Sequence, residues 1–174
     1  RRESLVLPDS TFDRDFYESL IYNQPEWLIP FFEKKYGMEQ SKKILKAFNT
    51  VPDTCIRVNT LKITTDAIKK QLKLKNISVE DIPYIQEGLS IKTGADTLFS
   101  EFLQTGLLYV QTASSMIPAK VLGPDAGDHV LDMCAAPGSK TTHIAALMGN
   151  RGSIDAWDVY PHKVKLIKDN AKRL

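Results

Sequence analysis

The sequence has very little cysteine and no long apolar run. Its 174 residues include only two cysteines, Cys55 and Cys134. Two cysteines exclude the disulfide framework that is typical of small secreted folds. No stretch has the length and apolar character of a secretory signal or a membrane span. These absences indicate a reducing compartment, and we expect a cytoplasmic location and no membrane partner.

The sequence also lacks a strong excess of charge. The 23 lysines and arginines against 21 acidic residues give a net charge of +2, which is too small to indicate RNA by itself. Two basic runs are either solvated helix faces or phosphate-contacting surfaces. The first contains Lys62, Lys69, Lys70, Lys73 and Lys75, and the second contains Lys163, Lys165, Lys168, Lys172 and Arg173.

Residues 130–147, VLDMCAAPGSKTTHIAAL, lack the glycines of the common phosphate-binding loops. A P-loop requires glycine at positions 134 and 139, which are Cys134 and Ser139 here. The dinucleotide fingerprint requires three spaced glycines, and only Gly138 is present. The segment still predicts a short strand, a turn of small residues and a helix from Gly138 or Ser139. A ligand can approach such a turn closely, and a nucleoside without phosphates is favoured.

The following segment completes a β-α-β unit. Residues 153–157 read as a second strand, and Pro161 suits the first turn of a helix that extends to about Leu174. Asp158 therefore lies at the end of the second strand, roughly 20 residues after the turn. A carboxylate at this position can accept hydrogen bonds from both hydroxyls of a ribose.

Several motifs resemble those of one enzyme family. Asp132 to Thr141 match D-x-C-A-A-P-G-[GS]-K-T, the motif I of the NOP2/Sun family of S-adenosylmethionine-dependent RNA cytosine-5 methyltransferases. Asp158 matches the family's ribose-binding position. Further matches are Lys163, Asn170, Arg173 and Leu174, the segment GLLYVQTASS (106–115), and the accessory signatures QPEW (24–27) and RVNTLK (57–62).

The resemblance implies S-adenosylmethionine as the cofactor and RNA as the partner, and no metal is expected. The implied cofactor-binding residues are Cys134, Ala135, Ala136, Pro137, Gly138, Ser139, Lys140, Asp158 and Lys163. Lys140 either counters the methionine carboxylate or is a solvated charge in the first turn of its helix. His143 has no second His, Cys or carboxylate at metal-ligand spacing, so a satisfied helix histidine is the preferred interpretation.

No catalytic residue is expected among these 174 residues. Enzymes of this family attack C6 of cytosine with a cysteine thiolate, and a second cysteine helps to release the product. Their cysteines follow Pro and Thr, but none of the nine prolines here precedes a cysteine. Thr54 and Cys55 lie in the accessory region, where Cys55 is interpreted as a buried structural residue. We therefore expect the nucleophile beyond Leu174 and the chain to be a piece of a longer enzyme.

The expected fold class is α/β, with a helical segment, a small α+β module similar to an RNA-recognition fold, and the start of a Rossmann-like methyltransferase core. The expected domains are residues 1–50, 51–98 and 99–174. Helices are predicted at 12–23, 25–36, 39–48, 65–74 and 114–122, and strands at 55–61, 77–82, 89–92 and 107–110.

Three positions outside the turn are ambiguous. Arg57 and Asn59 alternate to one face of the expected strand, so Arg57 is either an RNA contact or a surface residue. This strand offers no aromatic ring on which a base could stack. Gln111 either faces the cofactor region or helps to cap the helix that begins near residue 113. Trp157 alternates away from Asp158 and is expected to pack beneath a helix.

The function that the resemblance implies is methylation of cytosine C5 in RNA, with small-subunit ribosomal RNA favoured. Among the family's branches, the chain is most similar to the bacterial small-subunit ribosomal RNA methyltransferases B, on the evidence of Arg1 to Glu3 and the QPEW segment. Three alternatives remain open: a transfer-RNA cytosine-5 methyltransferase, a non-catalytic RNA-binding protein with a methyltransferase-like fold, and a nucleoside-using enzyme with a small-molecule substrate.

Overall fold

The chain divides into two compact units, Arg1–Pro52 and Asp53–Leu174. The computed structural model describes residues 13–93 and 101–174. Arg1 to Glu3, the first residue of the helix expected at 12–23, and the expected domain boundary between residues 98 and 99 lie outside the described residues. Among the described residues, no helix combines the length and the apolar character that crossing a membrane requires.

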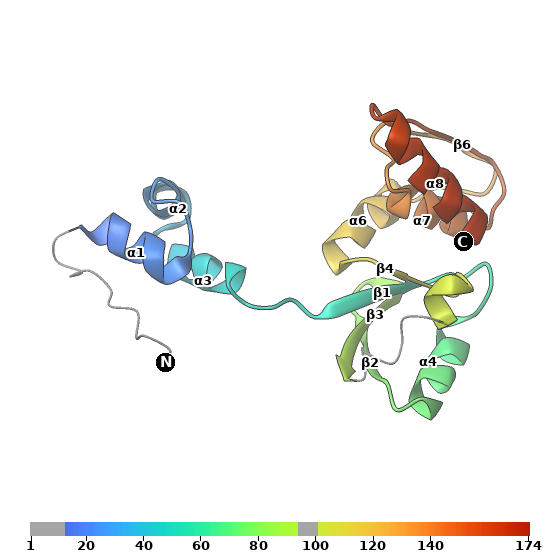
Figure 1. The fold of residues 1–174 in the computed structure, drawn as a ribbon, viewed down its shortest axis with the longest axis horizontal. Helices are drawn as coiled ribbons and strands as arrows, with labels where there is room; N and C mark the ends of the chain where they lie inside the picture. The colour runs from blue at the N-terminus through green and yellow to red at the C-terminus, as the bar shows by residue number, and fades with distance from the viewer. Residues whose placement is uncertain (1–12, 94–100) are drawn as a thin grey trace. The chain divides into compact units, whose positions relative to one another are not determined.

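The first unit contains three helices, α1 (Arg14–Tyr22), α2 (Leu28–Tyr36) and α3 (Met38–Phe48) (Figure 1). The carboxylate of Asp13 accepts a hydrogen bond from the Phe16 N–H and caps α1. Each helix contributes one residue to a small core of Tyr22, Ile29 and Leu45, all of them buried. The three helices pack as the spacing of their apolar residues predicted.

The second unit begins with a four-stranded antiparallel sheet in the order β2-β3-β1-β4. The strands are β1 (Thr54–Val58), β2 (Ser78–Ile82), β3 (Ile85–Thr93) and β4 (Leu108–Val110), and helix α4 (Thr65–Leu74) lies between β1 and β2 in the chain. Ile56 and Val58 on β1 and Ile68 and Leu72 on α4 share one fully buried core. Alternation along β1 thus directs its apolar residues toward α4.

The opposite side of this sheet faces the rest of the second unit (Figure 1). Helix α6 (Ala113–Leu122) contacts β3 and packs against helix α7 (Ser139–Leu147). Helix α7 connects the parallel strands β5 (His129–Asp132) and β6 (Ser153–Ala156), and helix α8 (Pro161–Arg173) follows β6. The mixed α/β class and the β-α-β unit that the sequence predicted are confirmed.

Most predicted elements appear within a few residues of their expected bounds. Helix α4 has the predicted bounds, but β3 begins four residues before the expected start at residue 89. The polar pair Gln86 and Glu87 obscures the apolar pattern there. Cross-strand pairing extends the strand, because Gly88 lies opposite Arg57 in the ladder with β1.

Candidate functional site

The turn of small residues, Cys134 to Gly138, lies at the carboxyl ends of β5 and β6, and Met133 joins it to β5. Trp157 N donates to Asp132 O at 2.8 Å, and Ala135 N donates to Trp157 O at 2.9 Å. These two bonds extend the parallel pairing beyond both strands and hold the turn beside the end of β6. Open α/β sheets bind their ligands at this edge, as the sequence indicated.

Asp132 holds the two ends of the turn together. Its Oδ1 accepts from the Cys134 N–H at 3.3 Å, and its Oδ2 accepts from the Thr141 hydroxyl at 2.7 Å. One carboxylate therefore links the last residue of β5 to the first turn of α7. Sequence reasoning included Asp132 and Thr141 in the motif but assigned them no role. The signal was the pairing of an acidic residue and a hydroxyl nine positions apart across a turn.

Helix α8 supports the turn from the side. Gly138 has a φ of +99°, and a Cβ at this position would lie 3.3 Å from the Ile167 Cα. Asn170 Nδ2 donates to Pro137 O at 2.8 Å. The left-handed backbone and the close approach of α8 both favour glycine, so the glycine of the motif has a structural reason.

The structure brings Asp158 to the turn. Its Oδ2 accepts from the Ala136 N–H at 3.1 Å, and its Oδ1 accepts from the Tyr160 N–H at 3.1 Å. The hydrogen bond from Tyr160 and that from Ala136, together with the positive charge of Lys163, lower the pKa of Asp158 below its ordinary value. The carboxylate is therefore ionised at neutral pH, and each oxygen keeps a lone pair for a further donor.

The other residues of the predicted site are distributed around this centre. Cys134 is an exposed free thiol in the turn, and Lys140 is exposed in the first turn of α7. Lys163 is half-buried, and its Nζ lies 4.5 Å from the centroid of the Tyr160 ring. No hydrogen bond or ion pair joins Lys140 to Asp158 within the part of the chain that the structure describes.

The prediction for Trp157 is wrong, and that for Cys55 is wrong in part. Trp157 does not pack beneath a helix, because 62% of its surface is exposed. Strand alternation fixes the side on which a residue lies, but it does not show whether another element covers that side. Cys55 is half-buried rather than buried, and its Sγ lies 3.6 Å from Asp53 O.

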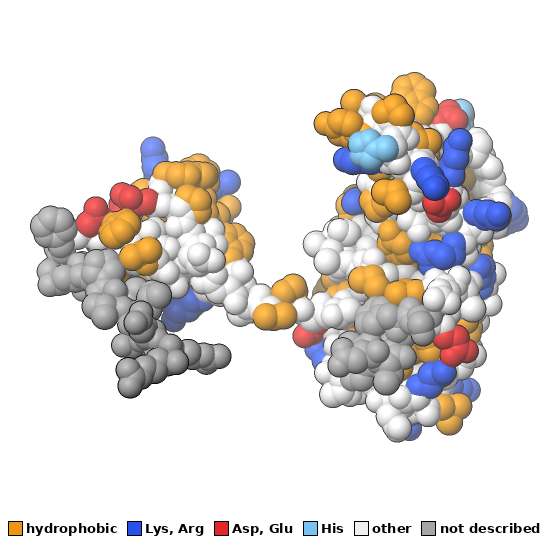
Figure 2. All heavy atoms as spheres, viewed as in Figure 1, with side chains coloured by type: hydrophobic (Ala, Val, Ile, Leu, Met, Phe, Trp, Pro, Cys, Tyr) orange, Lys and Arg blue, Asp and Glu red, His pale blue; other side chains and the backbone are white. Residues whose placement is uncertain are grey.

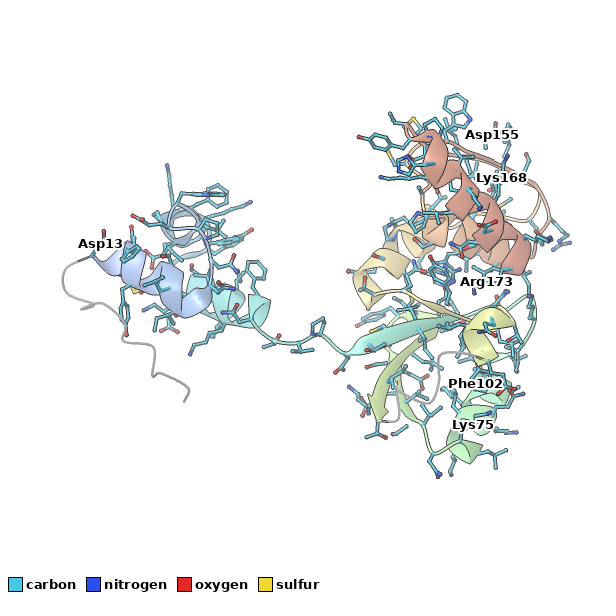
Figure 3. All side chains as sticks on the ribbon, in the orientation of Figure 1. Asp13, Lys75, Phe102, Asp155, Lys168 and Arg173 are labelled. Carbon is cyan, nitrogen blue, oxygen red and sulfur yellow. The ribbon has the colours of Figure 1, made fainter. Side chains whose placement is uncertain are left out.

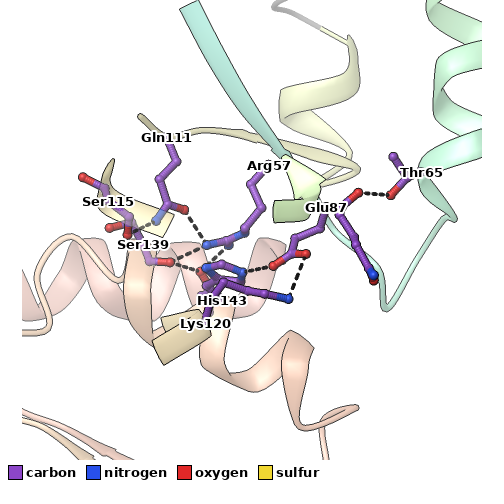
Figure 4. Close-up of polar contacts among 10 residues, drawn as sticks. Arg57, Thr65, Glu87, Gln111, Ser115, Lys120, Ser139 and His143 are labelled. Atoms are coloured by element: carbon purple, nitrogen blue, oxygen red, sulfur yellow. Dashed lines mark hydrogen bonds and ion pairs between the residues drawn. The ribbon is translucent and has the colours of Figure 1, made fainter. Parts of the chain in front are cut away.

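The prediction for Arg57 is also wrong, because its side chain is only 2% exposed and contacts neither solvent nor an open surface. Its Nη1 donates to Gln111 Oε1 at 2.6 Å and to Ser139 O at 2.5 Å, and its Nη2 donates to Thr142 Oγ1 at 2.9 Å (Figure 4). Burial lowers the pKa of Arg57 to about 10, so the guanidinium remains charged at neutral pH. Strand β1, which contains the first two residues of RVNTLK, thus binds the start of α7 through Arg57.

Beside Arg57, His143 forms a second buried pair. Its Nε2 lies 2.6 Å from Glu87 Oε1, and Lys120 Nζ lies 3.4 Å from Glu87 Oε2 (Figure 4). His143 is fully buried, and its Nδ1 has no partner among the described residues. Burial lowers the pKa of His143 despite the hydrogen bond to Glu87, so the neutral ring donates from Nε2. The prediction that His143 is hydrogen-bonded within the fold is confirmed for one of its two ring nitrogens.

We predict that acid destabilises the second unit through Glu87. Burial alone would raise the pKa of this carboxyl, but the hydrogen bond from His143 and the charge of Lys120 hold the pKa at about 2. A lowered pKa stabilises the fold above the ordinary value of about 4.5, and this stabilisation is lost as the pH falls toward 2. Neutral His143 acts in the same direction below its ordinary pKa of 6.5.

Urea unfolding between pH 7 and pH 3 measures this effect. Glu87→Gln should reduce the loss of unfolding free energy over this range by roughly 1–3 kcal/mol. Glu80→Gln is the matched control, because Glu80 is an exposed residue of the adjacent strand. Equal pH dependence of the wild-type protein and the Glu87→Gln variant would contradict the assignment.

A cavity of about 320 Å³ lies between α7, α8 and β6. Met148, Asn150, Ile154 and Ile167 are among its lining residues, and none of the predicted cofactor residues lines it. No group of three or more His, Cys, Asp or Glu side chains is placed to hold a metal ion within residues 13–93 and 101–174. The polar groups of the turn and Asp158 therefore remain the candidate site.

Two protein-family models match this chain. A model described as "Methyltr_RsmF/B-like, ferredoxin-like domain" matches residues 24–97, and one described as "16S rRNA methyltransferase RsmB/F" matches residues 119–174. The first match includes the four-stranded sheet up to β3, and the second includes the turn, α7, β6 and α8. The two matches thus include the elements that build the candidate site.

Individual relatives agree with these models. The probable ribosomal RNA small subunit methyltransferase B of Bacillus subtilis is 38% identical over 152 residues, which are 87% of this chain and 34% of the relative. The ribosomal RNA small subunit methyltransferase F of Erwinia tasmaniensis is 46% identical over 125 residues, which are 68% of this chain and 26% of the relative. The chain thus spans about a third or less of the length of these curated relatives.

A solved structure has the same fold. The crystal structure of a methyltransferase homolog protein from Pyrococcus horikoshii matches with a TM-score of 0.83 and 32% sequence identity. The match covers 93% of this chain and 53% of the other. The arrangement of helices and strands described above is therefore shared with a solved methyltransferase homologue.

Proposed function

Because the chain belongs to the RsmB/F methyltransferase family, we propose that it forms part of an S-adenosylmethionine-dependent enzyme that methylates C5 of cytosine in RNA, with small-subunit ribosomal RNA as the substrate. Membership of this family confirms the resemblance that the motifs indicated. The observation that carries the proposal is the hydrogen bond between Asp158 and Ala136, which joins the predicted ribose-binding carboxylate to the motif I turn.

The residues of the turn fit a nucleoside cofactor. Small side chains from Cys134 to Gly138 leave the backbone accessible, and the ionised Asp158 has lone pairs for two hydroxyl donors. Lys140 would counter the methionine carboxylate, and Lys163 would add positive charge beside Asp158. The cofactor, when bound, supplies an activated methyl group on a sulfonium. The chain's own residues bind and orient it.

Neither cysteine of the chain is proposed as the nucleophile. Cys134 belongs to the cofactor turn, and Cys55 is a half-buried residue of β1. A thiol that attacks cytosine must reach the base and be activated as a thiolate. Neither position combines these properties with the family's Pro-Cys motif, and we propose that the nucleophile is not among these residues.

Exposed lysines on α8 are the proposed RNA-facing charges of the second unit. Lys165, Lys168 and Lys172 are exposed, and Figure 2 shows Lys and Arg side chains in blue along the side of the unit where α8 lies in Figure 1. Two lysines of the earlier basic run form ion pairs with acidic residues of the same unit. Lys69 pairs with Asp81 at 2.5 Å and Lys75 with Glu101 at 2.7 Å. The exposed lysines of α8 are therefore better placed to contact phosphates.

A methyl-transfer assay tests the proposed function. The complete product of the gene is incubated with methyl-labelled S-adenosylmethionine and either small-subunit ribosomal RNA or transfer RNA, and nucleosides are identified after digestion. We expect 5-methylcytosine in the ribosomal RNA. The same product in transfer RNA alone would favour the transfer-RNA branch. Binding of RNA without any methylation would favour the non-catalytic RNA-binding protein.

A further inference from the structure

Two arginines from different parts of the second unit meet at one aromatic ring. Tyr109 lies on β4 opposite Arg57 of β1, and the Arg57 Cζ is 5.3 Å from the centroid of the Tyr109 ring. Arg173, at the end of α8, places its Cζ 5.5 Å from the same centroid. Figure 3 shows Arg173 where α8 meets the four-stranded sheet. Guanidinium groups at these distances are attracted by the face of a ring.

Arg57 fixes the backbone carbonyl of Ser139, the residue after Gly138. Its guanidinium donates to Ser139 O and to the Thr142 hydroxyl, both on α7. All of its hydrogen-bond acceptors within the described part of the chain are neutral, and its buried Nε has no partner there. Burying a cation among neutral acceptors costs free energy. The planar guanidinium of arginine can donate to two groups on α7 at fixed angles, and the ammonium of lysine cannot.

Arg173 acts on Pro137, the residue before Gly138, through the side chain of Asn170. Its Nη2 donates to Asn170 Oδ1 at 2.7 Å, and Asn170 Nδ2 donates to Pro137 O at 2.8 Å. Because Oδ1 accepts from the guanidinium, the amide of Asn170 has only its NH₂ group to offer Pro137. The Arg173 Nη1 also donates to Leu103 O at 2.5 Å, which anchors it to the segment before β4.

The two chains of hydrogen bonds therefore reach the carbonyls on either side of Gly138. Peptide groups are planar, so fixing Pro137 O also fixes the direction of the Gly138 N–H, and fixing Ser139 O fixes the Lys140 N–H. The Lys140 N–H is one of the free donors at the start of α7. Gly138 itself has a left-handed φ of +99°, a conformation that few other residues adopt. The peptide that follows Gly138 is linked to Arg57 through Thr142, because the Thr142 hydroxyl donates to Gly138 O and accepts from Arg57.

We propose that Arg57, Tyr109, Arg173 and Asn170 form a clasp that sets the shape of the cofactor turn. Arg57 of strand β1 thereby acts on S-adenosylmethionine binding rather than on RNA. The inference rests on the proposed function, because it takes the turn as the cofactor site. Arg57 and Asn170 are positioning residues, since they act through the peptides of the turn.

Two conservative variants of the complete gene product test the clasp. Arg57→Lys keeps the positive charge but loses the fork, and Asn170→Asp keeps the acceptor for Arg173 but loses the donor to Pro137 O. Calorimetry measures the affinity for S-adenosylmethionine, a filter assay measures the affinity for small-subunit ribosomal RNA, and thermal melting reports the fold. Arg151→Lys is the matched control, because Arg151 is exposed in the turn before β6.

Each variant of the clasp should weaken S-adenosylmethionine binding by roughly 10- to 100-fold, the loss expected for a hydrogen bond to or from a charged or strongly held group. RNA affinity should change less than twofold, and Arg151→Lys should match the wild type. Reduced RNA affinity with unchanged cofactor affinity would make Arg57 an RNA contact and overturn the proposal. So would full cofactor affinity in Asn170→Asp, which tests the clasp even where Arg57→Lys does not fold. A wild-type protein without cofactor binding would instead contradict the proposed function.

Discussion

Replacing Asp158 by alanine should weaken S-adenosylmethionine binding by about 1–3 kcal/mol, or roughly 5- to 150-fold in Kd. The carboxylate lies at the end of β6, is ionised because the Tyr160 and Ala136 N–H groups lower its pKa, and has lone pairs free for a ribose. The variant removes these acceptors and also frees the Ala136 N–H of the turn. Calorimetric titration of the wild-type protein and the variant measures the difference.

A second aspartate serves as the control for this experiment. Asp169 is an exposed residue of α8, so Asp169→Ala changes the net charge equally without touching the turn. Its affinity should equal that of the wild type. If both variants lost affinity equally, the effect would be one of general charge. If neither lost affinity, Asp158 would not belong to the site.

Replacing Gly106 by alanine should destabilise the second unit by about 2–4 kcal/mol, from the left-handed backbone and the overpacking together. Gly106 has a φ of +71°, and a Cβ there would lie 2.1 Å from Arg173 O. This atom is backbone, so the end of α8 must move. Asn59 Nδ2 donates to both Gly106 O and Leu174 O, which holds the same junction together.

Gly123 provides a matched control for Gly106. Its φ is +57°, and the nearest atom to an added Cβ is 3.9 Å away. Gly123→Ala therefore has the backbone strain without the clash, and should cost about 1 kcal/mol. Urea unfolding followed by Trp157 fluorescence in a Trp27→Phe background reports on the second unit alone. Equal destabilisation by both substitutions would show that α8 does not press against Gly106.

The centre of the candidate site could be predicted from sequence because its geometry is local. The turn and Asp158 follow two parallel strands, and the carboxyl ends of such strands meet at one edge of the sheet. The small residues of the turn also predicted a backbone open to a ligand. Neither step required knowledge of distant segments.

The role of Arg57 could not be predicted in this way. Alternation correctly placed Arg57 opposite the apolar residues of β1, but a strand with polar residues on one face is ordinarily half-exposed. Its partners Gln111, Ser139 and Thr142 lie 54 to 85 positions away in the chain. Gln111, expected at the cofactor region or in a helix cap, accepts from Arg57 and donates to Ser115 O of α6. These contacts exist only because α6 and α7 cover the second face of the sheet.

Titration of the ¹⁵N-labelled 174-residue chain with S-adenosylmethionine, followed by amide chemical shifts, tests the cofactor site most directly. The predicted result is a saturable change centred on Ala136, Gly138, Lys140 and Asp158, with little change around the cavity lined by Met148, Asn150 and Ile154. Changes centred on that cavity would place the ligand elsewhere and contradict the assignment of the turn. Unchanged spectra, in this chain and in the complete gene product alike, would contradict the assignment of the cofactor.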